Sequence, residues 1–195
     1  MQTNGLDHKT NQPINEIIQN LYLGDIRAVI EPTILFKNNI TAVISLLHKN
    51  EYSLFNEKNL LNIINKDNIY KIYINDYSTE NIKKYFLPLC KIIEYYINNN
   101  LSIFIHCNKG ISRSTTIILA YLLYKGYDSS YVYKFVKNKR SCIYPNYGFI
   151  QSLNLWNEEL KKQKFSLFSC LSPKSQKSQK SDKFIDKNML MIKTF

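Results

Sequence analysis

Three runs of apolar residues have the length and composition of buried strands. Residues 40–47 form a β-branched run, residues 70–75 alternate between apolar and polar positions, and residues 101–106 are mostly apolar. Between the second and third runs, large apolar residues recur at helical spacing, at Ile82, Tyr85, Phe86, Leu89, Ile92, Ile93, Tyr96 and Ile97. A strand, a helix and a strand in this order predict parallel pairing. The pattern therefore predicts an α/β fold built on a parallel sheet.

Short elements are expected before these runs. Residues 14–26 contain two short apolar stretches with Gly24 as punctuation, which suits an opening pair of strands or turns. Residues 34–36 are apolar and follow Pro32, which suits a short helix with proline in its first turn.

The segment after residue 106 changes to a helical pattern. A short polar loop at residues 107–112 precedes an apolar helix at residues 113–125, and Gly126 can end that helix. Asp128 or Ser129 can cap the next helix, and Asn146 can cap a last one. Three helices are therefore expected to close the domain.

Positive charge is concentrated at the C-terminal end of the chain. Residues 1–160 carry 17 Lys and Arg against 13 Asp and Glu, whereas residues 161–195 carry 9 Lys against 2 Asp. A Lys-Ser-Gln repeat at residues 174–181 has no apolar period, so it should be solvated. We expect a flexible N-terminus at residues 1–13, one folded domain at residues 14–165, and a basic, largely disordered tail at residues 166–195. Such a tail could bind anionic lipid or nucleic acid weakly.

Several classes of protein are excluded by what the chain lacks. The longest apolar run, residues 116–124, is far shorter than the ~20 residues that span a bilayer. No transmembrane segment is expected, and with no apolar signal sequence at the start we expect an intracellular protein. The cysteines show no Cys-x-x-Cys spacing and only three His accompany them, so neither a zinc site nor a disulfide framework is expected. These cysteines are Cys90, Cys107, Cys142 and Cys170.

The loop that leaves the third strand carries the candidate chemistry. It places the Cys107 thiol and the Arg113 guanidinium six positions apart, at a turn from a buried strand into a helix. Backbone N–H groups at such a turn can surround one phosphate-sized anion, Gly110 supplies an unusual backbone angle, and the helix N-terminus adds positive potential. The same field favours a thiolate, so we expect Cys107 to be ionised and nucleophilic.

At this point the sequence resembles the cysteine-dependent protein phosphatases. His106-Cys107, followed after five positions by Arg113-Ser114, is similar to the signature of that superfamily, and the Gly-x-Ser-Arg-Ser form resembles its dual-specificity branch. The resemblance covers about residues 14–162. Further segments similar to the family, in the correct order, are Tyr22-Leu23-Gly24, Asp76, residues 120–122 and residues 140–149.

The resemblance implies a fold and a mechanism. The fold would be of the protein tyrosine phosphatase type, a central, mostly parallel mixed β-sheet flanked by helices. Cys107 would attack phosphorus to form a cysteinyl-phosphate, and Arg113 would bind the equatorial oxygens. Asp76, which lies 31 residues before Cys107, would protonate the leaving oxygen and then activate water. Ser114 would hydrogen-bond the departing thiolate, and no metal or cofactor would be required.

Other residues would support this chemistry if the family pattern holds. His106 would fix the loop and tune the thiolate from behind. Asn146 would brace the loop from the last helix. The phosphate-binding segment would consist of Asn108, Lys109, Gly110, Ile111, Ser112 and Arg113.

Each assignment has a structural alternative. Asp76 could be a turn residue, with Glu80 or Asp67 as the acid, and Cys107 could be a core cysteine. His106 could be an ordinary core histidine and Asn146 only a helix cap. Cys90 and Cys142 suit packing, although a second cysteine sometimes traps the oxidised nucleophile in this family.

The substrate class also follows from the resemblance. Residues 1–75 are too few for the extra loop that deepens the pocket of tyrosine-specific relatives, so phosphotyrosine and phosphoserine or phosphothreonine in proteins are the expected substrates. An RNA 5′-triphosphatase or a phosphoinositide phosphatase is the alternative on the same fold, and Lys109 keeps it open. A phosphoprotein-binding module without turnover is a third possibility, but such modules usually lose the cysteine.

Overall fold

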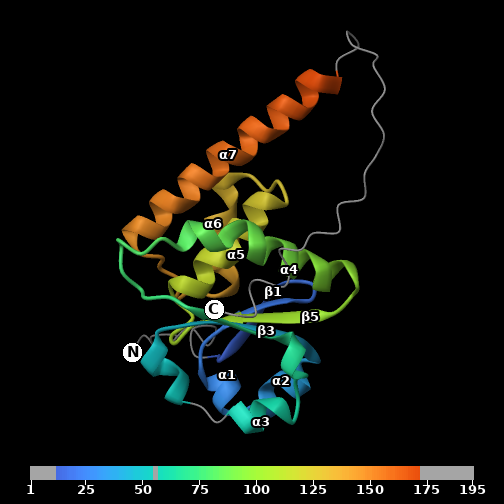
Figure 1. Ribbon diagram of the computed structural model, residues 1–195, viewed down its shortest axis with the longest axis vertical. Helices are drawn as coiled ribbons and strands as arrows, with labels where there is room; N and C mark the ends of the chain where they lie inside the picture. The colour runs from blue at the N-terminus through green and yellow to red at the C-terminus, as the bar shows by residue number, and fades with distance from the viewer. Residues whose placement is uncertain (1–11, 55–56, 172–195) are drawn as a thin grey trace, which may run out of the picture.

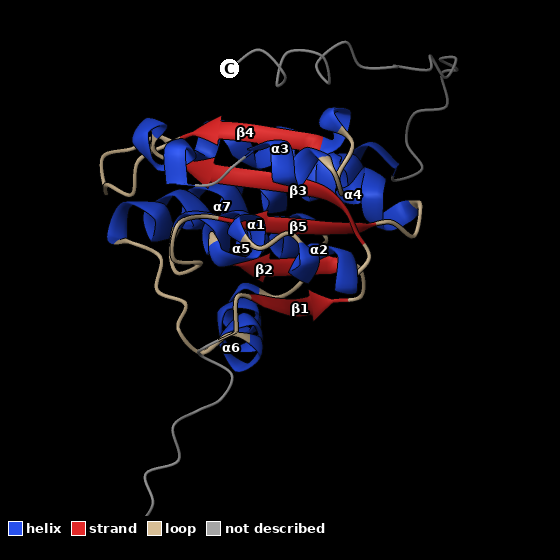
Figure 2. Cartoon of the chain, turned by 90° about the horizontal axis from the view of Figure 1, so that it is seen from below, coloured by secondary structure: helices blue, strands red, loops and turns tan. Residues whose placement is uncertain are grey.

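A five-stranded mixed sheet organises the chain. The computed structural model describes residues 12–54 and 57–171. The strands lie side by side in the order β1-β2-β5-β3-β4, and only the β1–β2 pair is antiparallel (Figure 2). Their bounds are β1 Ile14–Ile18, β2 Leu21–Gly24, β3 Ile40–Leu47, β4 Ile69–Tyr73 and β5 Ser102–His106. The predicted mostly parallel mixed sheet is confirmed.

Helices cover both faces of this sheet (Figure 1). One face carries α1 (Arg27–Ile30), α2 (Thr33–Lys37) and α3 (Glu57–Leu61). The other carries α4 (Phe86–Asn98), α5 (Arg113–Tyr124), α6 (Ser129–Lys139) and α7 (Tyr147–Leu171). The 3₁₀ helices are η2 (Lys49–Leu54), η3 (Lys66–Asn68) and η4 (Ile82–Tyr85). The sheet is therefore the middle layer of three.

The strands supply apolar side chains to both layers of helices. Ile44 and Ile105 belong to the larger core under α4, α5 and α7, whereas Val43 and Phe104 belong to the smaller core under α1–α3. Successive residues of a strand point to opposite faces, so a strand buried on both faces is apolar at nearly every position. This explains why most positions of β3 and β5 are apolar.

The structure differs from the predicted elements in a few places. The strand expected at residues 70–75 is β4, Ile69–Tyr73, because its partner β3 ends at Leu47, which pairs with Tyr73. Pro32 precedes α2 as its N-cap rather than lying within its first turn. The sequence pattern predicted no helix at the positions of α1, η2, α3 and η3.

The last helix extends further than expected. Helix α7 runs to Leu171 and so crosses the proposed boundary after residue 165. The expectation for the rest of the tail concerns residues 172–195, which lie outside the described residues, as do residues 1–11 of the proposed N-terminus. Within the described part of the chain, no helix combines the length and apolarity needed to cross a bilayer.

Candidate active site

Cys107 lies at the exit of β5 with two hydrogen-bond donors directed at its sulfur. The Gly110 N–H and the Ser114 hydroxyl each donate to Cys107 Sγ at 3.2 Å. The thiol is 1% exposed. The contacts therefore hold the sulfur at the start of the loop, between the loop backbone and the first turn of α5.

Gly110 is required by the shape of the loop. Its φ is +64°, a conformation that residues with a side chain rarely adopt. A Cβ atom at this position would lie 2.4 Å from the carbonyl oxygen of Gly24. The loop after β5 therefore packs against the end of β2, and only glycine fits between them.

Arg113 begins α5 and is nearly buried. Its Nη1 donates to Glu51 Oε2 at 2.6 Å and to the Ile74 carbonyl at 3.3 Å, and its Nη2 donates to Glu51 Oε1 at 3.2 Å. Its buried Nε has no hydrogen-bond partner in the structure. Burial acts to lower the pKa of Arg113, but the bonds to Glu51 and the nearby acidic groups raise it above its ordinary value.

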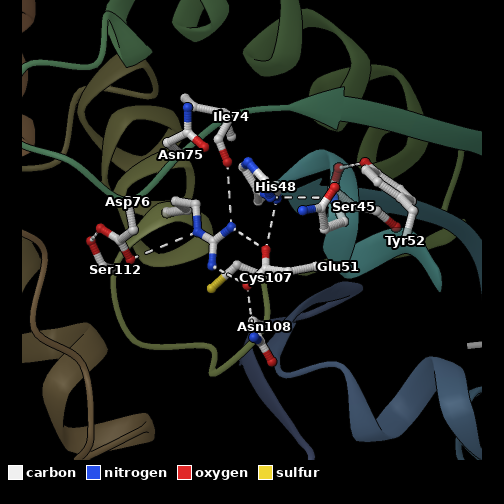
Figure 3. Close-up of polar contacts among 12 residues, drawn as sticks. Ser45, His48, Glu51, Tyr52, Ile74, Asn75, Asp76, Cys107, Asn108 and Ser112 are labelled. Atoms are coloured by element: carbon white, nitrogen blue, oxygen red, sulfur yellow. Dashed lines mark hydrogen bonds and ion pairs between the residues drawn. The ribbon is translucent and has the colours of Figure 1, made fainter. Parts of the chain in front are cut away.

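Asp76 follows β4 and meets the loop after β5 (Figure 3). Its Oδ1 accepts hydrogen bonds from Ser112 Oγ at 2.6 Å and from Asn146 Nδ2 at 2.8 Å. Its Oδ2 lies 3.7 Å from Arg113 Nε. The side chain is 36% exposed. A carboxyl held at the loop with one side open to solvent can exchange a proton with a substrate.

The two alternative carboxyls lie elsewhere. Asp67 is in η3, which precedes β4 and therefore lies at the opposite end of that strand from Asp76. Glu80 lies in the same connection after β4 as Asp76, but its carboxylate accepts a hydrogen bond from the Asn75 side chain at 2.9 Å. The geometry favours Asp76 over both.

His106 is buried behind the loop and does not hydrogen-bond the thiol. Its Nε2 lies 2.7 Å from Ser45 Oγ, its Nδ1 lies 3.2 Å from the Cys107 carbonyl oxygen, and its ring stacks on Phe104. Burial lowers the pKa of His106 to about 4, so the ring is neutral near pH 7. The ring thus contacts the backbone of the cysteine, and its expected roles in fixing the loop and tuning the thiolate stay predictions.

Asn146 caps a helix and also contacts the loop and Asp76. Its Oδ1 accepts from the Phe149 N–H at 3.0 Å, so it caps the first turn of α7. Its Nδ2 reaches Asp76, and its backbone N–H donates to Ser112 Oγ at 3.2 Å. The helix cap therefore also ties the acid to the loop.

The other loop residues differ in their surroundings. The Asn108 side chain donates to Glu51 Oε1 at 2.7 Å, and the Ile111 carbonyl accepts from the Tyr144 N–H at 2.8 Å. Lys109 is exposed, and its expected part in phosphate binding stays a prediction.

Arg140 is a loop-holding residue to which the sequence assigned no role. It is 1% exposed and donates to the carbonyls of Gly110 at 2.9 Å and Lys109 at 3.2 Å. It also pairs with Asp25 at 3.0 Å. Its remaining bonds go to the Gln12 carbonyl and to Asn15 Oδ1. The only sequence signal was its place at the start of the family-like segment 140–149.

Glu51 is the second residue that the sequence did not single out. It lies in η2, within a polar stretch that has no strand or helix periodicity.

Among the other cysteines in the described residues, Cys90 is buried in the core and Cys142 is partly buried, and both are free thiols. The disulfide trap stays a prediction.

The sequence is similar to a protein family and to several curated proteins. A family model described as dual specificity phosphatase, catalytic domain, matches residues 21–159. Dual specificity protein phosphatase 22-A of Danio rerio is 34% identical over 143 residues, which are 72% of this chain and 63% of that protein. Dual specificity protein phosphatase 9 of Homo sapiens is 29% identical over 153 residues, 76% of this chain and 37% of that protein. The chain thus spans less than two thirds of the length of these curated relatives.

Solved structures agree with the sequence matches. The crystal structure of the human tyrosine phosphatase-like serine/threonine/tyrosine-interacting protein superposes with a TM-score of 0.67 at 25% identity, covering 79% of this chain and 97% of that one. The crystal structure of DUSP15 superposes with a TM-score of 0.66 at 28% identity, covering 83% and 98%.

Proposed function

Because the chain belongs to the dual specificity phosphatase family, we propose that it hydrolyses phosphate monoesters of tyrosine, serine and threonine in proteins. Phosphorylated proteins are accordingly the proposed partners. The observation that carries this proposal is the set of contacts around Cys107 Sγ, which has donors from Gly110 and Ser114.

In the first proposed step, the Cys107 thiolate attacks phosphorus. A P–S bond forms and the P–O bond to the side chain of the substrate breaks. Asp76 gives its proton to the leaving oxygen, because an alkoxide or phenoxide is a poor leaving group at neutral pH. Arg113 and the backbone N–H groups of the loop hold the equatorial oxygens of the phosphate.

In the second step, water replaces the sulfur. The Asp76 carboxylate takes a proton from a water molecule, whose oxygen attacks phosphorus as the P–S bond breaks. Inorganic phosphate leaves, and the hydrogen bond from Ser114 stabilises the thiolate that reforms on Cys107.

The proposal is tested by turnover of an aryl phosphate and of phosphotyrosyl and phosphothreonyl peptides by the purified chain. Cys107→Ser should abolish turnover but keep substrate binding. Arg113→Lys should fail severely, since an ammonium group lacks the planar fork of the guanidinium. Cys142→Ser, which removes a thiol outside these contacts, is the matched control and should keep activity.

The same assays separate the alternatives. Binding of phosphopeptides without turnover by the unmodified chain would indicate a phosphoprotein-binding module. Hydrolysis of phosphoinositides or RNA 5′-triphosphates in preference to phosphopeptides would show that the proposed substrate class is wrong. The proposed cysteine mechanism would still apply.

A further inference from the structure

Two exposed tyrosines lie beside the proposed acid. Tyr77 follows Asp76 in the connection after β4, and Tyr147 is the first residue of α7, directly after Asn146. Tyr77 is 66% exposed and Tyr147 is 73% exposed. Single exposed tyrosines are common on protein surfaces, but two that lie together beside a reaction centre form a surface of their own. The mechanism proposed above uses neither ring.

Two contacts hold the backbones of these tyrosines side by side. At one end, Asn146 Nδ2 donates to Asp76 Oδ1 at 2.8 Å. At the other end, Gly148 packs so closely on Ser78 that a Cβ atom added to the glycine would clash with the Ser78 carbonyl oxygen. The tyrosines are the middle residues of the two segments 76–78 and 146–148, each about 3.8 Å along the chain from a contact. Their side chains therefore leave the protein surface next to each other.

Hydrogen bonds fix the backbone or the ring of each tyrosine. Tyr147 begins α7, and its hydroxyl accepts from Gln151 Nε2 at 2.9 Å, one helical turn further along. The Tyr77 carbonyl accepts from the Glu80 N–H at 3.0 Å, which closes a turn. A tyrosine ring has only two side-chain torsions to fix, so binding to it costs little conformational entropy. The two rings thus suit a role in binding.

The tyrosines lie on the leaving-group side of the site. In the proposed mechanism the loop after β5 holds the phosphate, and Asp76 lies beside it, with Oδ2 3.7 Å from Arg113 Nε (Figure 3). An acid that protonates the leaving oxygen has to lie within hydrogen-bond reach of that oxygen. In a phosphoprotein this oxygen belongs to the phosphorylated side chain, so the polypeptide that carries it passes over Asp76. Its neighbouring residues then reach the tyrosines.

The chemistry of the two rings indicates which kind of side chain would bind. Each ring offers an apolar face and one hydroxyl group. Aromatic and large aliphatic side chains gain most from such a surface, because burial removes apolar area from water and paired rings add a preferred geometry. Tyrosine is also one of the residues that most often dominate binding at protein surfaces.

We propose that Tyr77 and Tyr147 form a subsite for an aromatic or large aliphatic side chain that lies next to the phosphorylated residue of a protein substrate. The subsite is continuous with the catalytic site through the contact between Asp76 and Asn146. It rests on the proposed function, since it assumes that a phosphorylated polypeptide binds over the acid. It gives the site a sequence preference around the phosphorylated residue.

The test compares phosphothreonyl peptides that differ only at the two residues flanking the phosphothreonine, which has no ring of its own to occupy the subsite. Phe is placed before or after it, and matched peptides carry Ala, Arg or Glu at the same positions. For each peptide, kcat/KM is measured with the parent, Tyr77→Ala and Tyr147→Ala chains, and affinity is measured by calorimetry in the Cys107→Ser background. Tyr95→Ala is the control. Tyr95 is 49% exposed, but it lies near the end of α4, which leads into the end of β5 opposite the loop.

The parent should favour Phe over Ala at one of the two flanking positions by about tenfold, as burial of a ring against an aromatic pair provides. This ratio should fall to about twofold or less in Tyr77→Ala and in Tyr147→Ala, and Tyr95→Ala should keep the ratio of the parent. Because each ratio is taken within one variant, a general loss from a disturbed Asp76 cancels. Tyr77→Phe and Tyr147→Phe retain the rings and should retain the preference. Thermal unfolding reports whether each variant folds, and if one Ala variant does not, the other decides.

Three results would overturn the proposal. Equal kcat/KM and affinity for the Phe and Ala peptides with the parent would mean that no such subsite exists. A Phe preference that survives in both Tyr77→Ala and Tyr147→Ala would place the subsite elsewhere. A preference for Arg or Glu over Phe would show that charge selects the flanking residue.

Failure of the proposed hydrolysis gives a different result. A parent chain that binds the peptides without turnover would refute hydrolysis, and the ratio of affinities from calorimetry would still decide the role of the tyrosines. A chain that binds none of the peptides would refute both proposals.

Discussion

Ser112 Oγ lies 2.6 Å from Asp76 Oδ1, although 36 residues separate them in the chain. Ser112 belongs to the loop after β5, and Asp76 to the connection after β4. These two strands are not neighbours, because β3 lies between them in the sheet. The contact shows that the carboxyl ends of parallel strands bring the proposed acid to the proposed phosphate-binding loop.

Replacing the acid should slow turnover in a way that depends on the leaving group. Asp76→Asn should lower kcat by about 10²–10⁴ on phosphothreonine, the usual span of general acid catalysis, and by less on an activated aryl phosphate. Glu80→Gln is the control, since Glu80 hydrogen-bonds Asn75 instead of the loop. If Glu80→Gln shows the leaving-group dependence and Asp76→Asn does not, Glu80 is the acid.

Replacing Gly110 of the loop should be far more damaging than replacing Gly126, although both glycines have a positive φ. Gly110→Ala puts a Cβ 2.4 Å from a backbone oxygen, so it should abolish measurable aryl phosphatase activity and lower Tm. Gly126→Ala, at φ +89°, meets only the flexible end of Lys164 and should cost about 1 kcal/mol with activity retained. Equal effects of the two variants in thermal unfolding and activity assays would contradict the tight fit of the loop against Gly24.

Arg140 should be important for stability and for the loop. Arg140→Ala removes five hydrogen bonds and leaves the largely buried Asp25 with one cationic partner fewer, so unfolding should become easier by about 3–5 kcal/mol. Arg27→Ala, whose side chain is 50% exposed and pairs with the same Asp25, should cost less than about 1 kcal/mol. Urea unfolding of both variants checks this, and similar losses would refute the special role of the buried arginine.

His106 should make stability depend on pH. Burial lowers its pKa from 6.5 to about 4, so between these values the unfolded chain binds a proton that the native chain does not. Native stability should therefore fall as the pH drops from 6.5 towards 4, by at most about 1.4 kcal/mol per pH unit from this group. Urea unfolding at several pH values should show a shallower dependence in His106→Gln than in the parent. An identical dependence in His106→Gln and the parent would contradict a buried neutral ring.

Periodicity predicted the sheet because its central strands, β3 and β5, are buried on both faces and β4 alternates between buried and less buried positions. The run at residues 40–47 matches β3 (Ile40–Leu47), and the helical spacing after residue 82 matches η4 and α4. The connection at residues 48–68 gave no prediction, since its short helices bury few apolar residues and have no regular pattern. Such segments take their shape from the domain on which they pack.

The site could be predicted only where its residues are close in sequence or belong to a family-like segment. Residues 106–114 were found in this way, and Asp76 was placed by the end of its strand. The roles of Glu51 and Arg140 were not predicted, although Arg140 begins the family-like segment 140–149, because these roles depend on contacts across 62 and 30 residues of chain. Arg140 supports the loop through buried contacts, and its position in the sequence does not reveal those contacts.

The central claim, covalent catalysis by Cys107, is tested most directly by trapping the phosphorylated enzyme. An activated aryl phosphate labelled with radioactive phosphorus is mixed with the Asp76→Asn chain and quenched in the millisecond range. The activated leaving group departs without help from an acid, so the first step is still fast in Asp76→Asn. Hydrolysis of the cysteinyl-phosphate still needs the Asp76 carboxylate as base, so labelled phosphate should accumulate on the protein. The account predicts about one label per chain in Asp76→Asn and none in the Asp76→Asn, Cys107→Ser double variant. Turnover without any labelled protein, or label that persists after Cys107 is replaced, would contradict it.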